Sequence, residues 1–175
     1  MSKSIVIVQE LSGVVSAMDT ALFPVLSTHL DCQYGSSKQI IQELLKLGQG
    51  IDTSNGIFPL VAIFQPFKET LGVGYYAKVK IPKIVIAVSS NATDSAKDRY
   101  TNTFIPILYP IYEEFKKQLS KWPTIVEQDP EFIPHTKLDN PGSAPPASVA
   151  KQFNYYVDAI EIYDLQLTFQ LDSNC

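Results

Sequence analysis

The sequence predicts a single-domain α+β protein, and three observations lead to this fold class. Apolar and polar residues alternate over 75–89 and over 155–171, as in strands with one face in water. Apolar residues recur at three- and four-residue steps over 94–121, as in a helix that covers a core. The 175 residues contain no internal repeat and no second domain boundary, so we expect one domain over 1–175.

The first elements are expected to be helical. Residues 5–18 begin with four β-branched residues that a strand would favour, but Val8, Leu11, Val15 and Met18 recur at helical spacing. We therefore prefer an amphipathic helix, ended by Phe23-Pro24. A second helix is expected over 36–47, with Ser36 or Ser37 as its N-cap.

Strands are expected next. Residues 57–67 are rich in β-formers, and Pro59 and Pro66 bracket a short strand because proline cannot donate to a ladder. The glycines in 69–74 predict a hairpin connection to a long strand over 75–89. Its alternation slips by one residue near Pro82, which predicts a bulge there.

The longest helical pattern, 94–121, opens with Ser95-x-x-Asp98, which resembles a capping box. Pro106 and Pro110 interrupt the pattern, since proline removes a helix hydrogen bond and clashes with the preceding turn. We expect either a kink or two helices, with Pro110 at the first position of the second. The last strand, 155–171, is less regular over 157–162, where a second bulge is allowed.

Six of the twelve prolines fall within 123–154, which we expect to be an extended proline-rich loop or arm. A loop of this length inside a compact domain is commonly functional or disordered. We expect it to contact a neighbouring protein, so that deletion of 125–150 would spare the fold and weaken assembly. The alternative is a solvated excursion without a partner. The candidate interface residues are Phe132, Ile133, Pro134, Pro145 and Pro146.

Composition argues against several classes of protein. The net charge is −4, and the basic residues are scattered, so we expect no direct nucleic-acid binding. No apolar stretch is long enough to span a membrane, and the first residues do not form a secretory signal, so we expect folding in a cytoplasm. Charged residues are only 18% and aromatic residues are plentiful, which suggests either an aromatic core or an interface.

The residues that carry chemistry are not grouped in any catalytic, cofactor-binding or metal-binding pattern. His29 and His135 are isolated, and Cys32 near His29 does not by itself make a nucleophile–base pair. The last strand also carries three acidic residues for which contact with a partner's lysines is an option that the sequence does not require: Asp158, Glu161 and Asp164. We therefore expect a protein that is not an enzyme and has neither cofactor nor metal.

Several segments taken together are similar to a known family. They are Phe58–Phe64, the strand ending in Ile84–Ala87, the stretch Arg99-Tyr100-x-x-x-Phe104-Ile105-Pro106-Ile107-Leu108-Tyr109-Pro110-Ile111-Tyr112, and Tyr156–Ile162. In this order they resemble the tail-completion (tail-terminator) neck proteins of tailed bacteriophages, in the version found in phages of Bacteroidetes-like hosts. The resemblance covers roughly 36–121 and 155–170, and the stretch from Arg99 to Tyr112 is its most specific part. The segment 123–154 is longer than is usual in this family.

The resemblance implies an antiparallel sheet with helices packed on one face. It also implies a homo-oligomer, commonly a hexameric ring, that caps the tail tube and joins it to the head connector. The expected partners are the tail-tube protein and head–tail connector proteins, and the expected location is the virion neck. The alternatives are another connector, such as an adaptor or stopper that contacts the portal, and a small hydrolase or ligand-binding domain.

Overall fold

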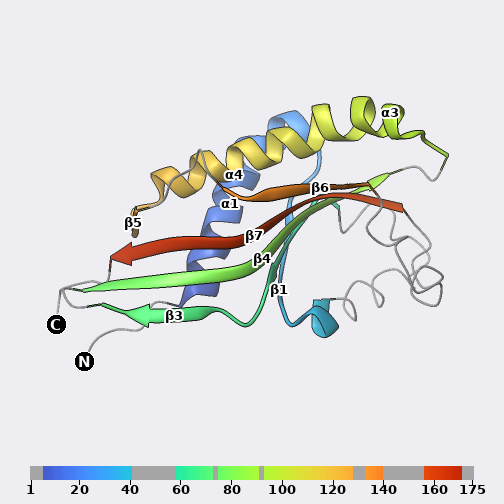
Figure 1. Ribbon diagram of the computed structural model, residues 1–175. Coiled ribbons are helices and arrows are strands. Elements are labelled where there is room, and N and C mark those ends of the chain that lie inside the picture. Colours follow the sequence, from blue (N-terminus) through green and yellow to red (C-terminus); the bar gives the residue numbers. More distant parts are fainter. Residues whose placement is uncertain are drawn as a thin grey trace.

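The computed structural model describes residues 6–40, 58–72, 75–90, 93–127, 133–139 and 156–170. Figure 1 shows a mixed sheet with helices packed against it. The elements follow in this order: α1 (Ile7–Leu26), β1 (Asp31–Gly35), β2 (Leu60–Phe64), β3 (Lys68–Leu71), β4 (Tyr76–Ser90), α3 (Ala96–Arg99), η2 (Tyr100–Leu108), α4 (Tyr109–Lys121), β5 (Ile125–Glu127), β6 (His135–Asp139) and β7 (Tyr156–Gln170).

The strands form one sheet in the order β1-β2-β4-β7-β5, with β3 beside β4 and β6 beside β7. Every pair is antiparallel except β1 with β2, which is parallel. The expectation of an antiparallel sheet is therefore correct only in part, and the sheet is mixed. The parallel strand β1 escaped prediction because its sequence, Asp-Cys-Gln-Tyr-Gly, has neither alternation nor a run of β-formers.

The two 15-residue strands β4 and β7 form the spine of the sheet. Their register is the same from Tyr76↔Gln170 to Ser90↔Tyr156, so the predicted bulges are absent from this pair. Instead both strands change phase together where Pro82 faces Asp164, whose φ is 52°. Odd-numbered residues of β4 are buried before Pro82 and even-numbered ones after it. The spine therefore curls without gaining a residue in either strand.

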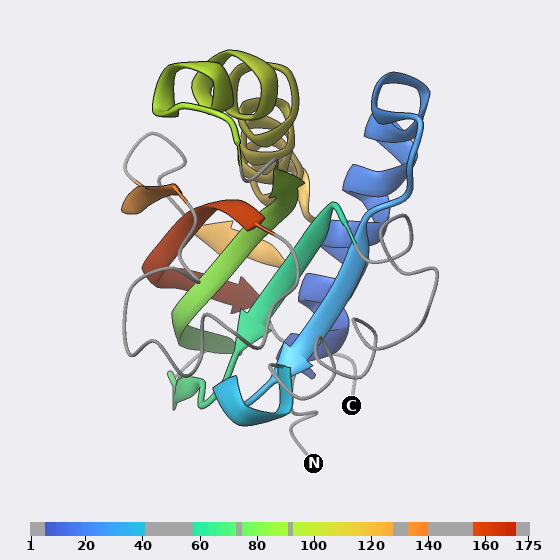
Figure 2. The same cartoon turned by 90° about the vertical axis from the view of Figure 1, so that its right-hand side faces the viewer.

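One face of the sheet carries the main core, beneath α1, η2 and α4. Figure 2 shows the helical path that contains η2 and α4 above the strands, with α1 at the right. In the predicted apolar stripe of α1, Leu11, Val15 and Met18 are buried and Val8 is half-buried. The prediction that Phe23-Pro24 ends the helix is wrong, because α1 continues to Leu26 with Pro24 inside its last turn.

Residues 96–121 form one helical path, and its middle segment, η2, is a nine-residue π-helix. The capping box of Ser95 and Asp98 is confirmed. Pro106 lies inside η2. It has no N–H, and its ring takes the space of a carbonyl one turn earlier, which a wider π turn relieves. Pro110 lies in the first turn of α4, close to its expected position.

The opposite face of the sheet carries a smaller cluster made by Ile40, Leu60 and Ala62. Ile40 belongs to the helix predicted over 36–47, whose start is described and is capped as expected. The Ser36 Oγ accepts from the Gln39 amide at 3.3 Å, and Gln39 Oε1 accepts from the Ser36 amide at 2.9 Å. The remainder of that prediction lies outside the described residues.

The proline-rich stretch 123–154 is not an extended loop throughout. β5 pairs with β7 near Phe169, and β6 pairs with β7 over Asp158–Ile162. Ile133, between them, is 6% exposed and belongs to the main core. These residues pack within the folded domain, which argues against the expectation that 125–150 can be deleted without loss of the fold.

Two polar contacts connect distant parts of the chain. The Glu10 carboxylate in α1 accepts from Trp122 Nε1 and from Thr124 Oγ1, both at 2.7 Å. The Arg99 guanidinium contacts the Asp158 carboxylate at 3.1 Å, and the two side chains are only 9% and 0% exposed. The first contact ties α1 to the end of α4, and the second ties α3 to β7.

Candidate interaction surfaces

A cation and two tyrosines meet where η2 and α4 pass beside strand β6. Lys137 Nζ lies 4.6 Å from the centre of the Tyr109 ring and 5.9 Å from that of Tyr100. The two tyrosine rings contact each other edge to face, with centres 6.0 Å apart and hydroxyl oxygens 3.4 Å apart. In the described part of the chain, no carboxylate lies within ion-pair distance of Lys137. We call this group the Lys137 cluster.

The protonation of the Lys137 cluster follows from these contacts. Burial alone raises the pKa of Tyr109, but its hydrogen bonds with Lys137 and Tyr100, together with the lysine charge, outweigh burial and lower that pKa. The hydrogen bond to Tyr109 raises the pKa of Lys137. The pKa of Tyr100 is raised, first by its hydrogen bond to Tyr109. Lys137 therefore remains a cation at neutral pH.

The cluster continues along β6 to His135. The ring nitrogen Nδ1 of His135 lies 2.9 Å from the Tyr112 hydroxyl, and the two rings pack with centres 4.6 Å apart. Lys116 Nζ lies 5.0 Å from the centre of the Tyr112 ring. Burial raises the pKa of Tyr112, so its hydroxyl keeps its proton. In this row Tyr100, His135 and Lys137 are exposed, Tyr109 is half-buried and Tyr112 is buried, so only part of it reaches the surface.

Sequence patterns did not predict the Lys137 cluster. Tyr100 and Tyr109 are nine residues apart, about two and a half turns of an α-helix, which places them on opposite faces. The π-helix takes more residues per turn and brings the two rings together. The interrupting Pro106 was the available signal of an irregular turn, but it did not reveal which residues would meet.

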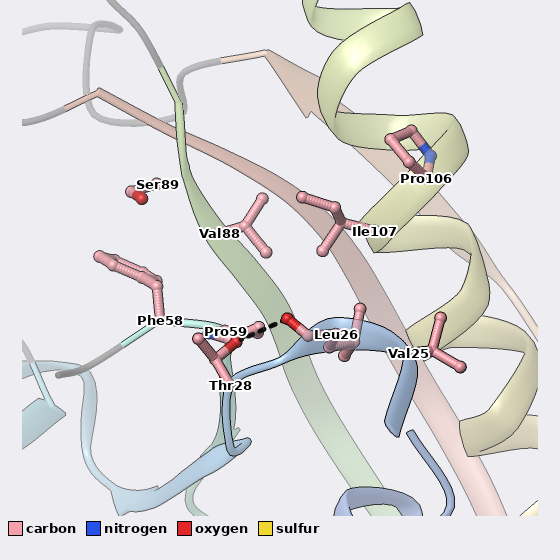
Figure 3. A pocket seen from close by; sticks show the side chains of 9 residues that line it. All are labelled: Val25, Leu26, Thr28, Phe58, Pro59, Val88, Ser89, Pro106 and Ile107. Atoms are coloured by element: carbon pink, nitrogen blue, oxygen red, sulfur yellow. Dashed lines mark hydrogen bonds between the residues drawn. The ribbon is translucent and has the colours of Figure 1, made fainter. Parts of the chain in front are cut away.

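The structure also contains an open, mostly apolar cavity of about 410 Å³. Figure 3 shows it between the end of α1, the Phe58-Pro59 corner, the end of β4 and η2. Its lining residues are Val25, Leu26, Thr28, Phe58, Pro59, Val88, Ser89, Pro106 and Ile107. Among these described lining residues the polar side chains are two hydroxyls, and they supply no acid, base or cation for catalysis.

The predicted interface residues are placed as follows. Ile133 is buried in its own chain, and Pro134 is exposed next to β6, where its carbonyl accepts from the Tyr163 amide at 3.2 Å. Phe132, Pro145 and Pro146 lie outside the described residues. The predicted interface therefore remains a prediction. Next to these positions the structure describes strand β6, with the Lys137 cluster beside it.

The isolated histidine and cysteine side chains have structural partners. His29 Nδ1 lies 2.8 Å from Asp19 Oδ2, and its ring stacks on Phe23. Burial raises the pKa of the Cys32 thiol, which lies 4.0 Å from the Ser12 hydroxyl. A protonated thiol is a poor nucleophile. Among the described residues, no group of three or more His, Cys, Asp or Glu side chains is placed to hold a metal ion.

The acidic residues of β7 face cations of their own chain. Asp158 pairs with Arg99, Glu161 with Lys83 at 3.0 Å, and Asp164 with Lys80 at 2.9 Å. The suggestion that they face a partner's lysines is not needed to explain them.

The edge strand β3 offers a different surface. All four of its residues are exposed, and Leu71, its last residue, exposes 66% of its surface. Nearby, Tyr75 and Tyr76 expose 57% and 43%. Among the described residues, β3 pairs only with β4. Edge strands with apolar side chains are ready to pair with another chain.

The described helices include none that is long and apolar enough to cross a membrane. Comparisons of the chain with protein-family models, with curated proteins and with solved structures give no match.

Proposed function

We propose that the protein is a structural subunit of a bacteriophage neck. In this proposal it acts as a tail terminator: copies form a ring that caps the tail tube and joins it to the head connector. The observation that carries the proposal is the segment from Arg99 to Tyr112, which resembles the corresponding part of tail-completion proteins. The virion neck is then its location, and the tail-tube and connector proteins are its partners.

The structure supports this proposal through the position of that segment. Arg99 holds α3 to β7 through a buried ion pair, while Tyr100 and Tyr109 present their rings beside β6. One segment thus contributes both to the core and to an outer surface. A ring needs two different patches that fit each other. Two such patches are the Lys137 cluster, beside the edge strand β6, and the exposed strand β3 at the opposite edge of the sheet.

The cavity does not favour a hydrolase. Catalysis of that kind needs a nucleophile with a base in hydrogen-bond reach. The described residues that line the cavity provide the hydroxyls of Thr28 and Ser89 and no base. Two of the groups with shifted pKa values, the half-buried Tyr109 and the exposed Lys137, lie beside β6 and not in this cavity. An assembly surface accounts for them better than an active site does.

The test is to mix purified protein with tail tubes and image the product by negative stain. The expected result is a ring of protein at one end of the tube. The same protein alone, measured by sedimentation over a wide range of concentration, shows whether the ring exists before it meets the tube. Protein that stays monomeric at high concentration and binds no tube would refute the proposal. Protein that binds portal complexes but not tubes would indicate an adaptor or stopper instead.

A further inference from the structure

The two outer strands β3 and β6 lie on opposite sides of the β4–β7 spine. In Figure 1, β3 runs below β4, and β6 runs above β7. In the part of the chain that the structure describes, β3 has β4 as its one strand partner and β6 has β7. Each therefore has an edge at which backbone groups face away from the sheet.

The direction of these backbone groups can be worked out from two hydrogen bonds. The Gly72 amide donates to the Tyr76 carbonyl at 2.8 Å. Antiparallel ladders alternate, so Lys68 and Thr70 turn their backbone groups toward β4, whereas Glu69 and Leu71 turn theirs outward. The Tyr163 amide donates to the Pro134 carbonyl at 3.2 Å. By the same alternation, the outward groups of β6 belong to His135, Lys137 and Asp139.

The side chains at these outward positions lie on the same face of the sheet. Glu69 is opposite Val79, and Lys137 is opposite Ile160. Val79 and Ile160 both belong to the main core beneath the helices. Residues opposite each other in a ladder point to the same face, so Glu69 and Lys137 both belong to the face that carries the helices.

The charges of Glu69 and Lys137 are opposite, so these two side chains can pair across the two edges. Glu69 is exposed, and the described residues place no cation in ion-pair distance of it. Lys137, likewise without a carboxylate partner in the described part, keeps its charge. We propose that copies of this chain join head to tail, with β3 of one copy pairing antiparallel with β6 of the next and Glu69 opposite Lys137. The inference rests on the ring assembly proposed above and names the contact that builds it.

This register brings the outward backbone groups of the two edges opposite each other and also pairs the two opposite charges. It sets Glu69 against Lys137 and Leu71 against His135, and these are the residues whose backbone groups face outward. It also sets Thr70 against Thr136, a favourable cross-strand pair. A shift by one residue would oppose inward groups to outward ones. A shift by two would leave Lys137 opposite Leu71 or Phe67 and lose the charge pair.

Charge reversal tests the contact between side chains. Glu69→Lys and Lys137→Glu should each weaken association by roughly fivefold or more, because like charges then oppose each other. The double variant, Glu69→Lys with Lys137→Glu, should return the dissociation constant to near the original value, because the pair is restored with its signs exchanged. Sedimentation velocity over a concentration series measures all four proteins.

Proline substitution tests the backbone contact. Glu69→Pro removes an outward amide and leaves the β3–β4 ladder intact, so it should abolish association while the monomer stays folded. Thr70→Pro is the matched control, because it removes an amide that faces β4 and should loosen the hairpin instead. Circular dichroism and thermal unfolding of each monomer separate the two effects.

The outcomes distinguish this contact from the proposed function. Association that ignores all of these variants would overturn the β3–β6 contact and leave the ring proposal standing with another interface. Association that follows the variants but gives open filaments with no affinity for tail tubes would support the contact and refute the tail terminator. A chain that is monomeric both alone and with tail tubes would refute both.

Discussion

A single position, Gly13, determines how closely α1 packs against the end of α4. Gly13 of α1 lies directly beneath the Trp122 ring, so a Cβ atom there would come within 2.6 Å of the indole carbon Cζ2. The ring cannot move aside freely, because its Nε1 donates to Glu10 at 2.7 Å. Judged from helix propensity alone, glycine at this position should make the helix less stable than alanine would. Its reason is a contact with a residue more than a hundred positions later, which no local pattern reveals.

Gly13→Ala should therefore destabilise the protein even though alanine is the better helix former. Overpacking costs about 1–3 kcal/mol, and the gain in helix propensity offsets up to about 1 kcal/mol of it. Chemical denaturation followed by the fluorescence of Trp122, the one tryptophan of the chain, measures the difference. Ser16→Ala, on the exposed face of the same helix, is the control and should be neutral or slightly stabilising. An equally neutral Gly13→Ala would show that the indole adjusts without loss.

The Arg99–Asp158 pair gives a second prediction at this scale. Asp158→Asn leaves a buried guanidinium without its carboxylate, and removing one partner of a buried pair costs about 3–5 kcal/mol. The double variant Arg99→Met with Asp158→Leu removes both charges and should be more stable than Asp158→Asn. Thermal and denaturant unfolding of the three proteins test this order. The reverse order would mean that the ion pair itself, rather than the cost of an unpaired charge, dominates.

At the scale of elements, regular stretches were predictable and irregular ones were not. The strand β4 and the stripe of α4 follow from period alone. The parallel strand β1 and the π-helix η2 do not, because neither carries a periodic pattern of its own. The strands β5 and β6 were hidden for another reason: prolines dominate their surroundings, while their partner β7 lies far away in the sequence. Tertiary pairing decides such segments, not local propensity.

Ile133 tests whether this proline-rich stretch belongs to the domain. It is 6% exposed in the main core, so Ile133→Ala should cost about 2–5 kcal/mol of stability. Val126→Ala, at a position 45% exposed in β5, is the matched control and should cost much less. Equilibrium unfolding in urea provides the comparison. Deletion of 125–150 should likewise unfold the domain, since it removes β5, Ile133 and β6 together. A stable, folded deletion variant would restore the view of this stretch as an arm.

At the scale of the whole molecule, the proposed contact depends on surfaces that meet only after folding. The sequence correctly indicated an α+β protein, whereas the predicted interface at 132–134 stays a prediction. Lys137 gains its neighbours from η2 and α4, and Glu69 lies on the opposite edge of the sheet. Neither residue stands in a motif. Two structural facts make them a candidate contact. Their backbone groups point outward from β3 and β6, and their side chains lie on the same face of the sheet.

Hydrogen exchange should show this contact directly. In the monomer, the outward amides of Glu69, Leu71, His135 and Lys137 face solvent and should exchange fast. In the assembled protein these four should slow strongly, while the amide of Thr70, which already faces β4, should change much less. Exchange measured by nuclear magnetic resonance or by fragment mass spectrometry at low and high protein concentration gives the answer. Equal slowing along all of β3 would indicate general stabilisation rather than edge pairing.

The curled spine has a consequence for the shape of such an assembly. Glu69 is level with Val79 of β4, whereas Lys137 is level, through Ile160, with Ile86. Each added copy is therefore displaced along the strands by seven positions, about 23 Å at 3.3 Å per residue. It adds four strands of width, about 19 Å at a spacing of 4.8 Å. In a closed ring the strands would incline about 50° to the axis, slightly beyond the range of closed barrels, so the channel wall would be a helically staggered sheet.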